Sequence, residues 1–231
     1  MKRFWKEVEV AEDAEGGWAI QLDGRSVKTP AREVLRAPTK ALADAIAEEW
    51  NAVEGEIDPR AMPLTGLANA AIDRIAPDPA TFALGLTRYA EADLACYRSD
   101  WPPELVTRQA ESWDPLLAWA RRRYDTDFAT TTGLTHVPQA PATVEQLSHA
   151  VSALDPFRLA GLSPLVTIGG SLVASLAVLE HAIEPEEAWD AVSIDDRWQI
   201  DQWGADHDAE AALENRKRDF LAAARFLDLL S

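Results

Sequence analysis

Apolar and polar residues alternate in the first part of the chain, and this pattern predicts a small β-sheet. Between residues 4 and 27 the apolar positions recur with a period of two, which is typical of strands with one buried face. Asp23-Gly24 lies between two such stretches and is a strong signal for a two-residue hairpin. We therefore expect an antiparallel sheet with turns at Glu15-Gly16-Gly17 and at Asp23-Gly24, and a further short strand near residues 34–36.

From Thr39 onward the apolar residues recur every three or four positions, which predicts helices. The first helix follows Thr39, a residue type that often caps helices, and ends at Gly55. Its apolar stripe includes Trp50. Similar stripes predict further helices within residues 64–75, 79–97, 104–124, 143–154, 185–198 and 213–227.

Three features between these stripes affect where helices begin and end. Asp114-Pro115 either kinks the helix over 104–124 or divides it into two. The Thr-rich residues 128–139 are typical of an extended connector or a short hairpin. Thr143 and Gln146 form a capping-box pattern, which predicts that the next helix begins at Thr143.

The longest uncharged stretch runs from Leu159 to Leu179. Its length would suffice for a membrane span, but it contains Pro164, the Gly169-Gly170 pair and several hydroxyl side chains. We favour another interpretation, in which a short helix ends near Leu162 and a second helix, capped by Ser163, is apolar on every side. Such a helix belongs at the centre of a helical core.

These patterns together predict an α+β protein, with a small N-terminal antiparallel β unit followed by a mainly α-helical domain. We place the β-rich unit with its first helix at residues 1–60. The helical domain then occupies residues 61–231, built around the buried apolar helix near residues 163–182.

Acidic residues are in large excess. The 39 Asp and Glu residues against 22 Lys and Arg give a formal net charge of −17. This argues against binding to nucleic acid or to an anionic membrane, because Lys and Arg drive both. A charged partner is therefore expected to be basic.

The ends and the cysteine content bear on location. The single cysteine, Cys96, excludes an internal disulfide and a Cys-rich zinc site, and favours a reducing compartment. The first residues show neither a signal core nor a leader, so we expect a cytoplasmic protein, although a mature form with its leader removed would look the same.

The sequence lacks the signatures of nucleotide, hydrolytic and metal chemistry. Neither Gly16-Gly17 nor Gly169-Gly170 is followed by Lys-Ser or Lys-Thr, so no phosphate-binding loop is expected. Ser171 lacks the glycine pattern of a hydrolase nucleophile and is expected to be a packed helix hydroxyl. Asp206-His207-Asp208 could suggest a metal, but three consecutive residues on a helix point in three directions. We expect no cofactor and no metal ion.

One constellation supports a small-molecule enzyme as the alternative hypothesis. Glu91 and Asp93 fall in the third predicted helix, and Arg98 follows them. Two residues that lie two positions apart on a helix face different ways, so one cleft would need a third residue from elsewhere. A pocket enclosing perturbed carboxylates would favour an enzyme, and a broad exposed patch would favour protein binding.

Two tryptophans and four acids gather between Trp198 and Glu210, around a helix joint expected at Gly204. Aromatic rings supply contact area and carboxylates supply selectivity for a basic partner. The candidate partner-binding residues are Trp203, Asp206, Asp208 and Glu210. An alternative interpretation is purely structural: buried tryptophans at a helix joint, and an acidic first turn that complements the helix dipole.

Two further tryptophans are expected to be structural. Trp50 lies on the apolar stripe of the first helix and Trp113 on that of the helix over 104–124. Truncation of a large buried aromatic residue such as Trp50 to alanine should cost several kcal/mol.

A set of short motifs occurs in an order that resembles a known family. The motifs are Arg3-Phe4-Trp5-Lys6, Leu22-Asp23-Gly24-Arg25, Val27-Lys28-Thr29-Pro30, Glu48-Glu49-Trp50, Met62-Pro63-Leu64-Thr65, Tyr89-Ala90-Glu91-Ala92-Asp93-Leu94, Cys96-Tyr97-Arg98, Trp113-Asp114-Pro115-Leu116-Leu117 and Trp203-Gly204-Ala205-Asp206. Together they resemble the assembly chaperones of the F-type ATP synthase that attend its alpha subunit, of the mitochondrial assembly factor 2 type. The resemblance extends over nearly the whole chain.

The resemblance implies a non-catalytic chaperone that binds the free alpha subunit, prevents its aggregation and releases it when the beta subunit arrives. It also implies a bacterial relative of a mitochondrial factor, and we expect a monomer without membrane insertion. In that family the acidic stretch after the Trp-Gly pair is linked to chaperone activity, and the matching positions here are Asp206, Asp208 and Glu210. Where a glutamate is expected this chain has Asp208, preceded by His207, so the decisive acid stays open.

Overall fold

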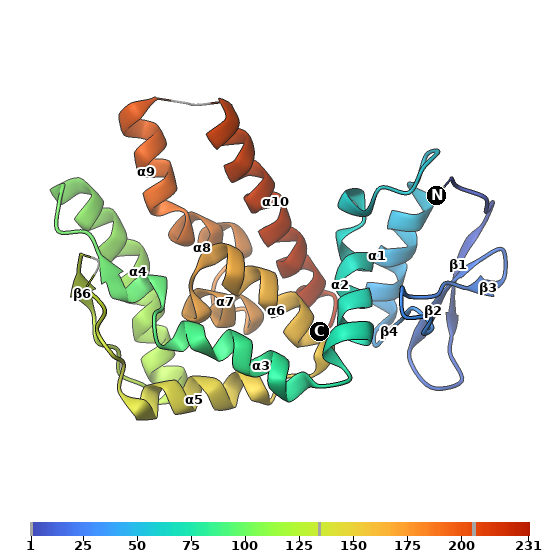
Figure 1. Ribbon diagram of the computed structural model, residues 1–231, viewed down its shortest axis with the longest axis horizontal. Coiled ribbons are helices and arrows are strands. Elements are labelled where there is room, and N and C mark those ends of the chain that lie inside the picture. Colours follow the sequence, from blue (N-terminus) through green and yellow to red (C-terminus); the bar gives the residue numbers. More distant parts are fainter. Residues whose placement is uncertain (1, 134, 205–206) are drawn as a thin grey trace. The chain divides into compact units, whose positions relative to one another are not determined.

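The computed structural model describes residues 2–133, 135–204 and 207–231 (Figure 1). In this part of the chain an N-terminal antiparallel sheet is followed by ten α-helices, with two further short strands between helices, which confirms the predicted α+β class. The strands are β1 (Val8–Glu12), β2 (Trp18–Leu22), β3 (Arg25–Ser26), β4 (Arg36–Ala37), β5 (Tyr97–Arg98) and β6 (Thr131–Thr132). The helices are α1 (Lys40–Asn51), α2 (Pro63–Ala70), α3 (Pro79–Thr87), α4 (Pro103–Tyr124), α5 (Pro141–Ser152), α6 (Pro156–Gly169), α7 (Leu172–Leu179), α8 (Pro185–Val192), α9 (Ile194–Trp203) and α10 (His207–Asp228).

Residue contacts divide the chain into two compact units. The first unit contains Met1–Pro79, Asp155–Gly161 and Arg225–Ser231, and the second contains Ala80–Leu154 and Leu162–Ala224. The division into residues 1–60 and 61–231 as separate domains stays a prediction. The first unit includes later segments because its membership depends on tertiary contacts, which a linear pattern does not reveal.

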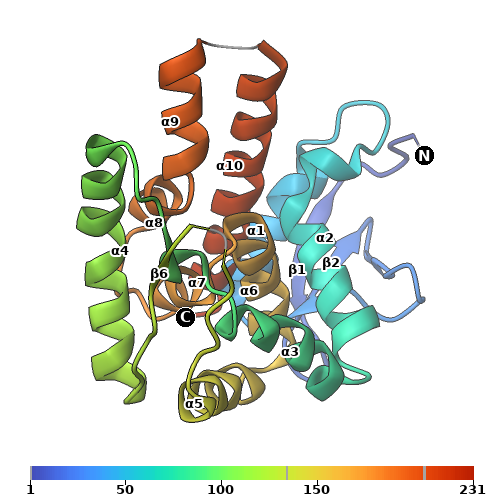
Figure 2. The same cartoon turned by 60° about the vertical axis from the view of Figure 1, so that its left-hand side comes forward.

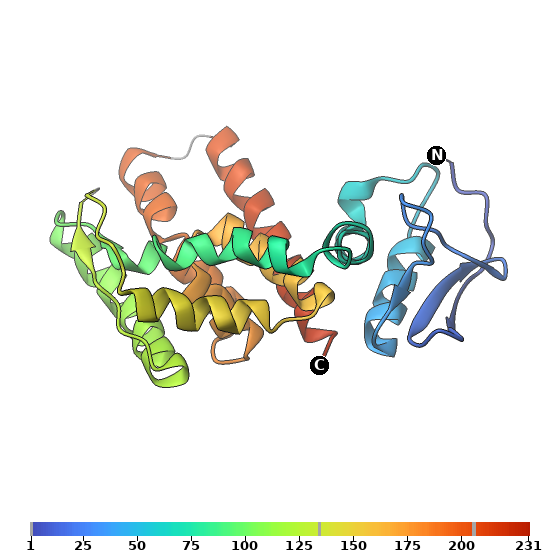
Figure 3. The same cartoon turned by 60° about the horizontal axis from the view of Figure 1, so that its bottom comes forward.

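In the first unit, an antiparallel sheet is packed against α1. β2 pairs with β1, with Val10 opposite Ile20, and also with β3 and β4. The hairpin predicted at Asp23-Gly24 is confirmed, and both residues have the positive φ angles, 49° and 75°, that a tight turn of this kind requires. Helix α1 begins after the predicted cap, Thr39, and lies along β1 and β2 (Figure 3).

Two of the family-like motifs meet in this unit, because Glu49 of α1 caps the N-terminus of α2. Its carboxylate accepts hydrogen bonds from the backbone N–H groups of Leu64 and Thr65 at 2.7 and 2.8 Å, and from the Thr65 hydroxyl at 2.7 Å. Burial raises the pKa of Glu49, and these hydrogen bonds oppose the rise. These hydrogen bonds link α1 directly to α2, although a loop separates the two helices in the sequence.

The last residues of the chain also belong to the first unit. The Thr39 hydroxyl donates a hydrogen bond to the carbonyl of Leu229 at 2.5 Å, and the rings of Phe157 and Phe226 are stacked 6.2 Å apart. The Cα of Gly161 lies so close to Leu227 that an added Cβ would meet that side chain at 2.5 Å. Glycine at this position therefore allows α6 and α10 to approach closely.

Helix α7 occupies the centre of the second unit. Its residues Leu172 to Val178 are all buried, and α4 and α8 pack against it (Figure 2). Trp113 of α4 is also buried, and its indole N–H donates to the carbonyl of Ala191 in α8 at 2.8 Å. The prediction of an apolar central helix is confirmed.

The boundary of that helix was predicted wrongly. Ser163 and Pro164 lie inside α6, and the chain breaks instead at Gly170, whose φ is +70°, and Ser171, which caps α7 by accepting from the N–H of Ala174 at 3.0 Å. A proline within a helix removes one hydrogen bond but does not always end the helix. A glycine in the left-handed region followed by a serine cap ends it more effectively.

The third helix is shorter than predicted. Helix α3 ends at Thr87, and two short 3₁₀ turns, Arg88–Ala90 and Leu94–Cys96, follow it. Asp93 caps the second turn through Ala95, while its carboxylate also reaches the N-terminus of α7. This long-range contact holds residues 91–93 outside a helix, so Glu91 and Asp93 do not share one.

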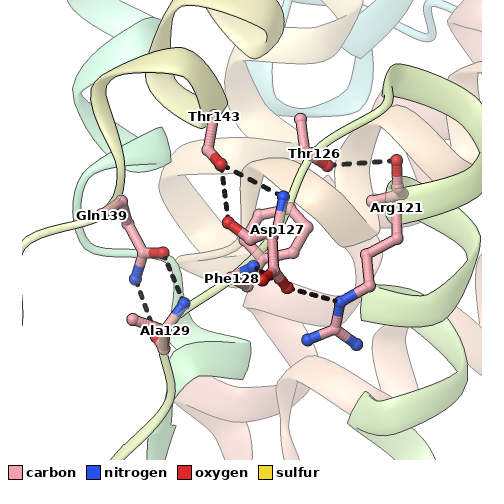
Figure 4. A network of polar contacts seen from close by, with 8 residues as sticks. Arg121, Thr126, Asp127, Phe128, Ala129, Gln139 and Thr143 are labelled. Carbon is pink, nitrogen blue, oxygen red and sulfur yellow. Dashed lines mark hydrogen bonds and ion pairs between the residues drawn. The ribbon is translucent and has the colours of Figure 1, made fainter.

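The described residues of the Thr-rich stretch, 128–133 and 135–139, form an extended connector, and β6 within it pairs in parallel with β5. Figure 4 shows how side chains replace missing strand neighbours: Gln139 both donates to and accepts from the backbone of Ala129, at 2.8 and 2.9 Å. The Thr143 hydroxyl donates a hydrogen bond to the backbone carbonyl of Asp127 and accepts one from the N–H group of the same residue. It therefore does not cap its own helix, which begins at Pro141 rather than at Thr143.

Pro115 and Ser193 differ in their effect on the helices around them. Helix α4 continues through Pro115 without division, and Ser193 separates α8 from α9. Among the described residues, no helix has both the length and the apolar character needed to cross a membrane.

Candidate functional site

The residues of the enzyme hypothesis do not form a cleft. Asp93 is fully buried and accepts hydrogen bonds from the Ser171 hydroxyl at 2.8 Å and from the N–H groups of Val173 and Ala95 at 2.9 and 3.0 Å. Glu91 is exposed, and it borders a separate hollow beside His136. The carboxylates of Glu91 and Asp93 therefore do not act on one space.

Arg98 has a structural environment as well. Its Nε donates to the Ala95 carbonyl at 2.7 Å, one terminal nitrogen donates to Asp114 at 2.8 Å, and its guanidinium lies 5.2 Å from the centre of the Trp113 ring. Burial raises the pKa of Asp93, although hydrogen bonds to its carboxylate lower it in part. We conclude that Asp93 anchors the start of α7, and that Arg98 links the turn at Ala95 to Asp114 of α4.

Helix α9 leads into the predicted aromatic and acidic cluster. Gly204 ends α9 with φ +86°, and its N–H donates to the carbonyl of Ile200 at 3.0 Å, so the predicted joint is present. Trp203 is the last residue of α9, but its side chain and the whole of Asp206 lie outside the described residues. The placement of these two candidates is therefore not part of the site geometry.

The other two candidates lie in the first turn of α10. Asp208 and Glu210 are both exposed, and Asp208 lies 3.6 Å from the imidazole of His207. Residues two apart on a helix face different sides. Only Glu210 lines the groove described next, so the structure does not bring Asp208 and Glu210 to one surface.

A groove with a volume of about 640 Å³ lies between α4, α8, α9 and α10. Its apolar lining is contributed by Trp189, Ile194, Ile200 and Leu213. Trp189 and Ile194 are buried, whereas Ile200 and Leu213 are only half-buried. Charged side chains form the rim, namely Arg108, Asp190, Arg197, Asp201, Glu210, Glu214 and Lys217.

The charges of the rim are unevenly paired. Arg197 lies 2.8 Å from Asp190, and Arg108 lies 3.5 Å from Asp201 while its guanidinium is 5.0 Å from the ring centre of Trp198. In the described part of the chain, no ion pair involves Glu210 or Glu214. The α10 side of the groove is therefore acidic, and the opposite side is neutralised by its own ion pairs.

Sequence reasoning found Glu210 but missed the groove around it. Leu213 is the first residue of the apolar stripe that predicts a helix within residues 213–227, and the structure leaves it half-buried. The spacing Glu210, Leu213, Glu214, Lys217 marks one helix face at three- and four-residue intervals. This mixed face could have indicated a surface that is neither core nor fully solvated.

The two structural tryptophans are both buried. Trp50 packs against Trp5 with ring centres 5.3 Å apart, and its exposed fraction is 8%. Trp113 is 1% exposed and makes the hydrogen bond described above. Neither ring offers surface to a partner, and their energetic roles stay predictions.

No group of three or more His, Cys, Asp or Glu side chains could hold a metal ion among the residues that the structure describes. The Cys96 thiol is buried, which together with nearby Asp93 raises its pKa to about 12. A thiol of this kind is a poor nucleophile and a poor ligand.

Comparison with known proteins decides the family. The model of the ATP12 chaperone protein family matches residues 2–121, which is more than half of the chain. The chain belongs to this family. The resemblance found in the sequence motifs is thereby confirmed, and the protein is an assembly chaperone of the ATP synthase rather than an enzyme.

The similarity of this ATP12 family member to known relatives covers 97–100% of its length. The crystal structure of Atp12 from Paracoccus denitrificans has 44% sequence identity and a TM-score of 0.94, and the match covers 100% of this chain and 98% of that one. The mitochondrial protein atp12 of Schizosaccharomyces pombe is 25% identical over 98% of this chain and 81% of its own length. The mitochondrial protein ATP12 of Saccharomyces cerevisiae is 23% identical, and the match covers 97% of this chain and 84% of that protein.

Proposed function

We propose that this ATP12 chaperone binds the free alpha subunit of the F-type ATP synthase and prevents its aggregation until the beta subunit replaces it. Membership of the ATP12 chaperone family is the observation that carries the proposal. We further propose that the chaperone acts as a monomer in the cytoplasm. Its net charge of −17 fits a basic client surface and would speed the encounter.

We also propose that the end of α9 and the start of α10 contact the client. Trp203, Asp206, Asp208 and Glu210 are the candidate residues, and the exposure of Asp208 and Glu210 supports this. The half-buried apolar residues beside Glu210 add contact area of the kind that protein interfaces use. Exposed acids can be replaced without loss of core packing, so their role can be tested separately from folding.

The test is dilution of the alpha subunit of the same organism from denaturant, with and without the chaperone. Light scattering follows aggregation, and size-exclusion chromatography of the soluble fraction detects a complex. We expect suppressed aggregation and a co-eluting complex. Addition of the beta subunit should then release the chaperone. Aggregation unchanged by a folded chaperone would contradict the proposal.

A charge-reversal variant tests the acidic contact. Asp206→Lys combined with Asp208→Lys should fold normally but lose protection of the alpha subunit. The matched control is Glu9→Lys with Glu12→Lys, two exposed acids of β1, which changes the net charge equally. If the Asp206 and Asp208 double variant protects as well as wild type, these two acids are not the contact.

A further inference from the structure

We propose that the groove between α4, α8, α9 and α10 binds a segment of the client whose apolar side chains are flanked by Lys or Arg. This deepens the proposed function, on which it rests for the identity of the client. The apolar lining favours apolar side chains of a client, and Glu210 and Glu214 of α10, which form no ion pair with any described residue, favour a cation beside them.

The apolar lining is the first argument. Ile200 of α9 and Leu213 of α10 line the groove, and both also line a second hollow of about 340 Å³ that is bordered by Ala209 and Ala212. These two side chains therefore separate two hollows and are only half-buried. Apolar side chains left in this position gain free energy when a partner covers them.

The size of the groove is the second argument. A volume of about 640 Å³ falls within the range of roughly 300–1,000 Å³ that is typical of ligand pockets. This space accommodates a few side chains of one segment and not a folded domain. A helix or an extended segment that places several apolar side chains on one side would fit it.

The charge distribution is the third argument. Glu210 and Glu214 are one turn apart on α10, and like charges at this spacing repel each other. Lys217 lies one turn beyond Glu214, yet it forms no ion pair within the described ranges. The cations on the other side, Arg108 and Arg197, are occupied by Asp201 and Asp190. A cationic group of a client would relieve the repulsion between the two glutamates.

The experiment uses the full chain and three fluorescently labelled helical peptides, with binding measured by fluorescence anisotropy. The first peptide carries Leu on one side and Lys on the other, the second replaces Lys by Glu, and the third replaces Leu by Ser. We expect the Leu and Lys peptide to bind at least about tenfold more tightly than either of the others. Equal binding of the Leu and Glu peptide would overturn the proposed selectivity.

Variants of the groove then locate the binding. Glu210→Lys with Glu214→Lys should weaken binding of the Leu and Lys peptide about tenfold or more, because exposed charge pairs contribute modestly and two attractions become repulsions. Leu213→Ser should weaken it severalfold without any change of charge. The control Glu9→Lys with Glu12→Lys should bind nearly as wild type does.

Equal weakening by the β1 control would show that binding depends on overall charge, and this would overturn the groove as the site. Unchanged binding by both groove variants would overturn it as well. Thermal unfolding of each variant separates these outcomes from misfolding. If the peptides behave as expected but the alpha subunit is not protected, the proposed function fails while the groove stands.

Discussion

Helix α7 and the groove side of α9 and α10 both carry apolar side chains, but those of α7 are buried whereas Ile200 and Leu213 in the groove are only half-buried. Around α7 every residue from Leu172 to Val178 is buried, and the polar groups at its start are bonded to Asp93. Along the groove, Ile200 and Leu213 are half-buried and Glu210 and Glu214 lack cationic partners in the described structure.

This difference separates residues that stabilise the fold from residues available to a client. Removal of a group from α7 or its anchor leaves a cavity or an unbonded buried polar atom, and both are costly. Removal of a group from the groove exposes little that was buried before. Mutations should therefore lower stability in the first region and client protection in the second.

The largest loss of stability is expected from Asp93→Ala. The change leaves the Ser171 hydroxyl and the N–H groups of Ala95 and Val173 buried without their acceptor, at a cost of about 3–5 kcal/mol in the free energy of unfolding. Urea denaturation followed by circular dichroism measures it. A loss below about 1 kcal/mol would show that water or another group replaces the carboxylate.

A matched pair of leucines tests the comparison directly. Leu176→Ala, at a position 1% exposed in α7, should cost about 2–5 kcal/mol because it creates a cavity. Leu213→Ala in the half-buried groove should cost about 1 kcal/mol or less. The same denaturation experiment serves both variants. Equal losses would mean that the groove is as much a part of the core as α7.

The pH dependence of stability should carry the signature of Asp93. Burial raises the pKa of this carboxyl above its ordinary value of 3.8, so the native state binds a proton more tightly than the unfolded state. The linked stability is present below pH 3.8 and is lost as the pH rises through the raised pKa. Relative to Asp93→Asn, the wild type should therefore lose stability as the pH rises above 3.8. Parallel profiles of the two proteins would contradict this assignment.

The smallest effect on stability is expected from Glu210→Gln with Glu214→Gln. Both side chains are exposed, so the free energy of unfolding should change by no more than about 0.5 kcal/mol. Protection of the alpha subunit should nevertheless weaken. Thermal unfolding and the aggregation assay, run on the same preparation, check the two halves of this prediction. A large loss of stability would assign the glutamates to the fold instead.

Local patterns in the sequence were sufficient wherever neighbours along the chain decide the structure. The alternation before Val27 and the Asp23-Gly24 turn predicted the sheet, and Thr39 predicted the start of α1. The joint at Gly204 was also predicted, because a glycine with positive φ is a local requirement. The candidate Glu210 was found because acids beside aromatic residues are visible in the sequence.

Long-range contacts decided the positions where the predictions were wrong. Asp93 was assigned to a helix and to a possible active site, but its bond to Ser171 links residues 78 positions apart and defines the start of α7. Thr143 was expected to cap its own helix, but its hydroxyl is used by Asp127. When a side chain has two possible hydrogen-bond partners, the tertiary fold decides which of them lies nearby. Helix propensity does not reveal this choice.

The sequence by itself determined the α+β class, the apolar central helix, the acidic character and, through its ordered motifs, the chaperone family. Only the tertiary structure decided that Asp93 is an anchor and that Glu210 faces a groove together with Glu214, Ile200 and Leu213. The physical reason is that periodicity reports which face of a segment is apolar. Whether another segment covers that face depends on how the helices pack.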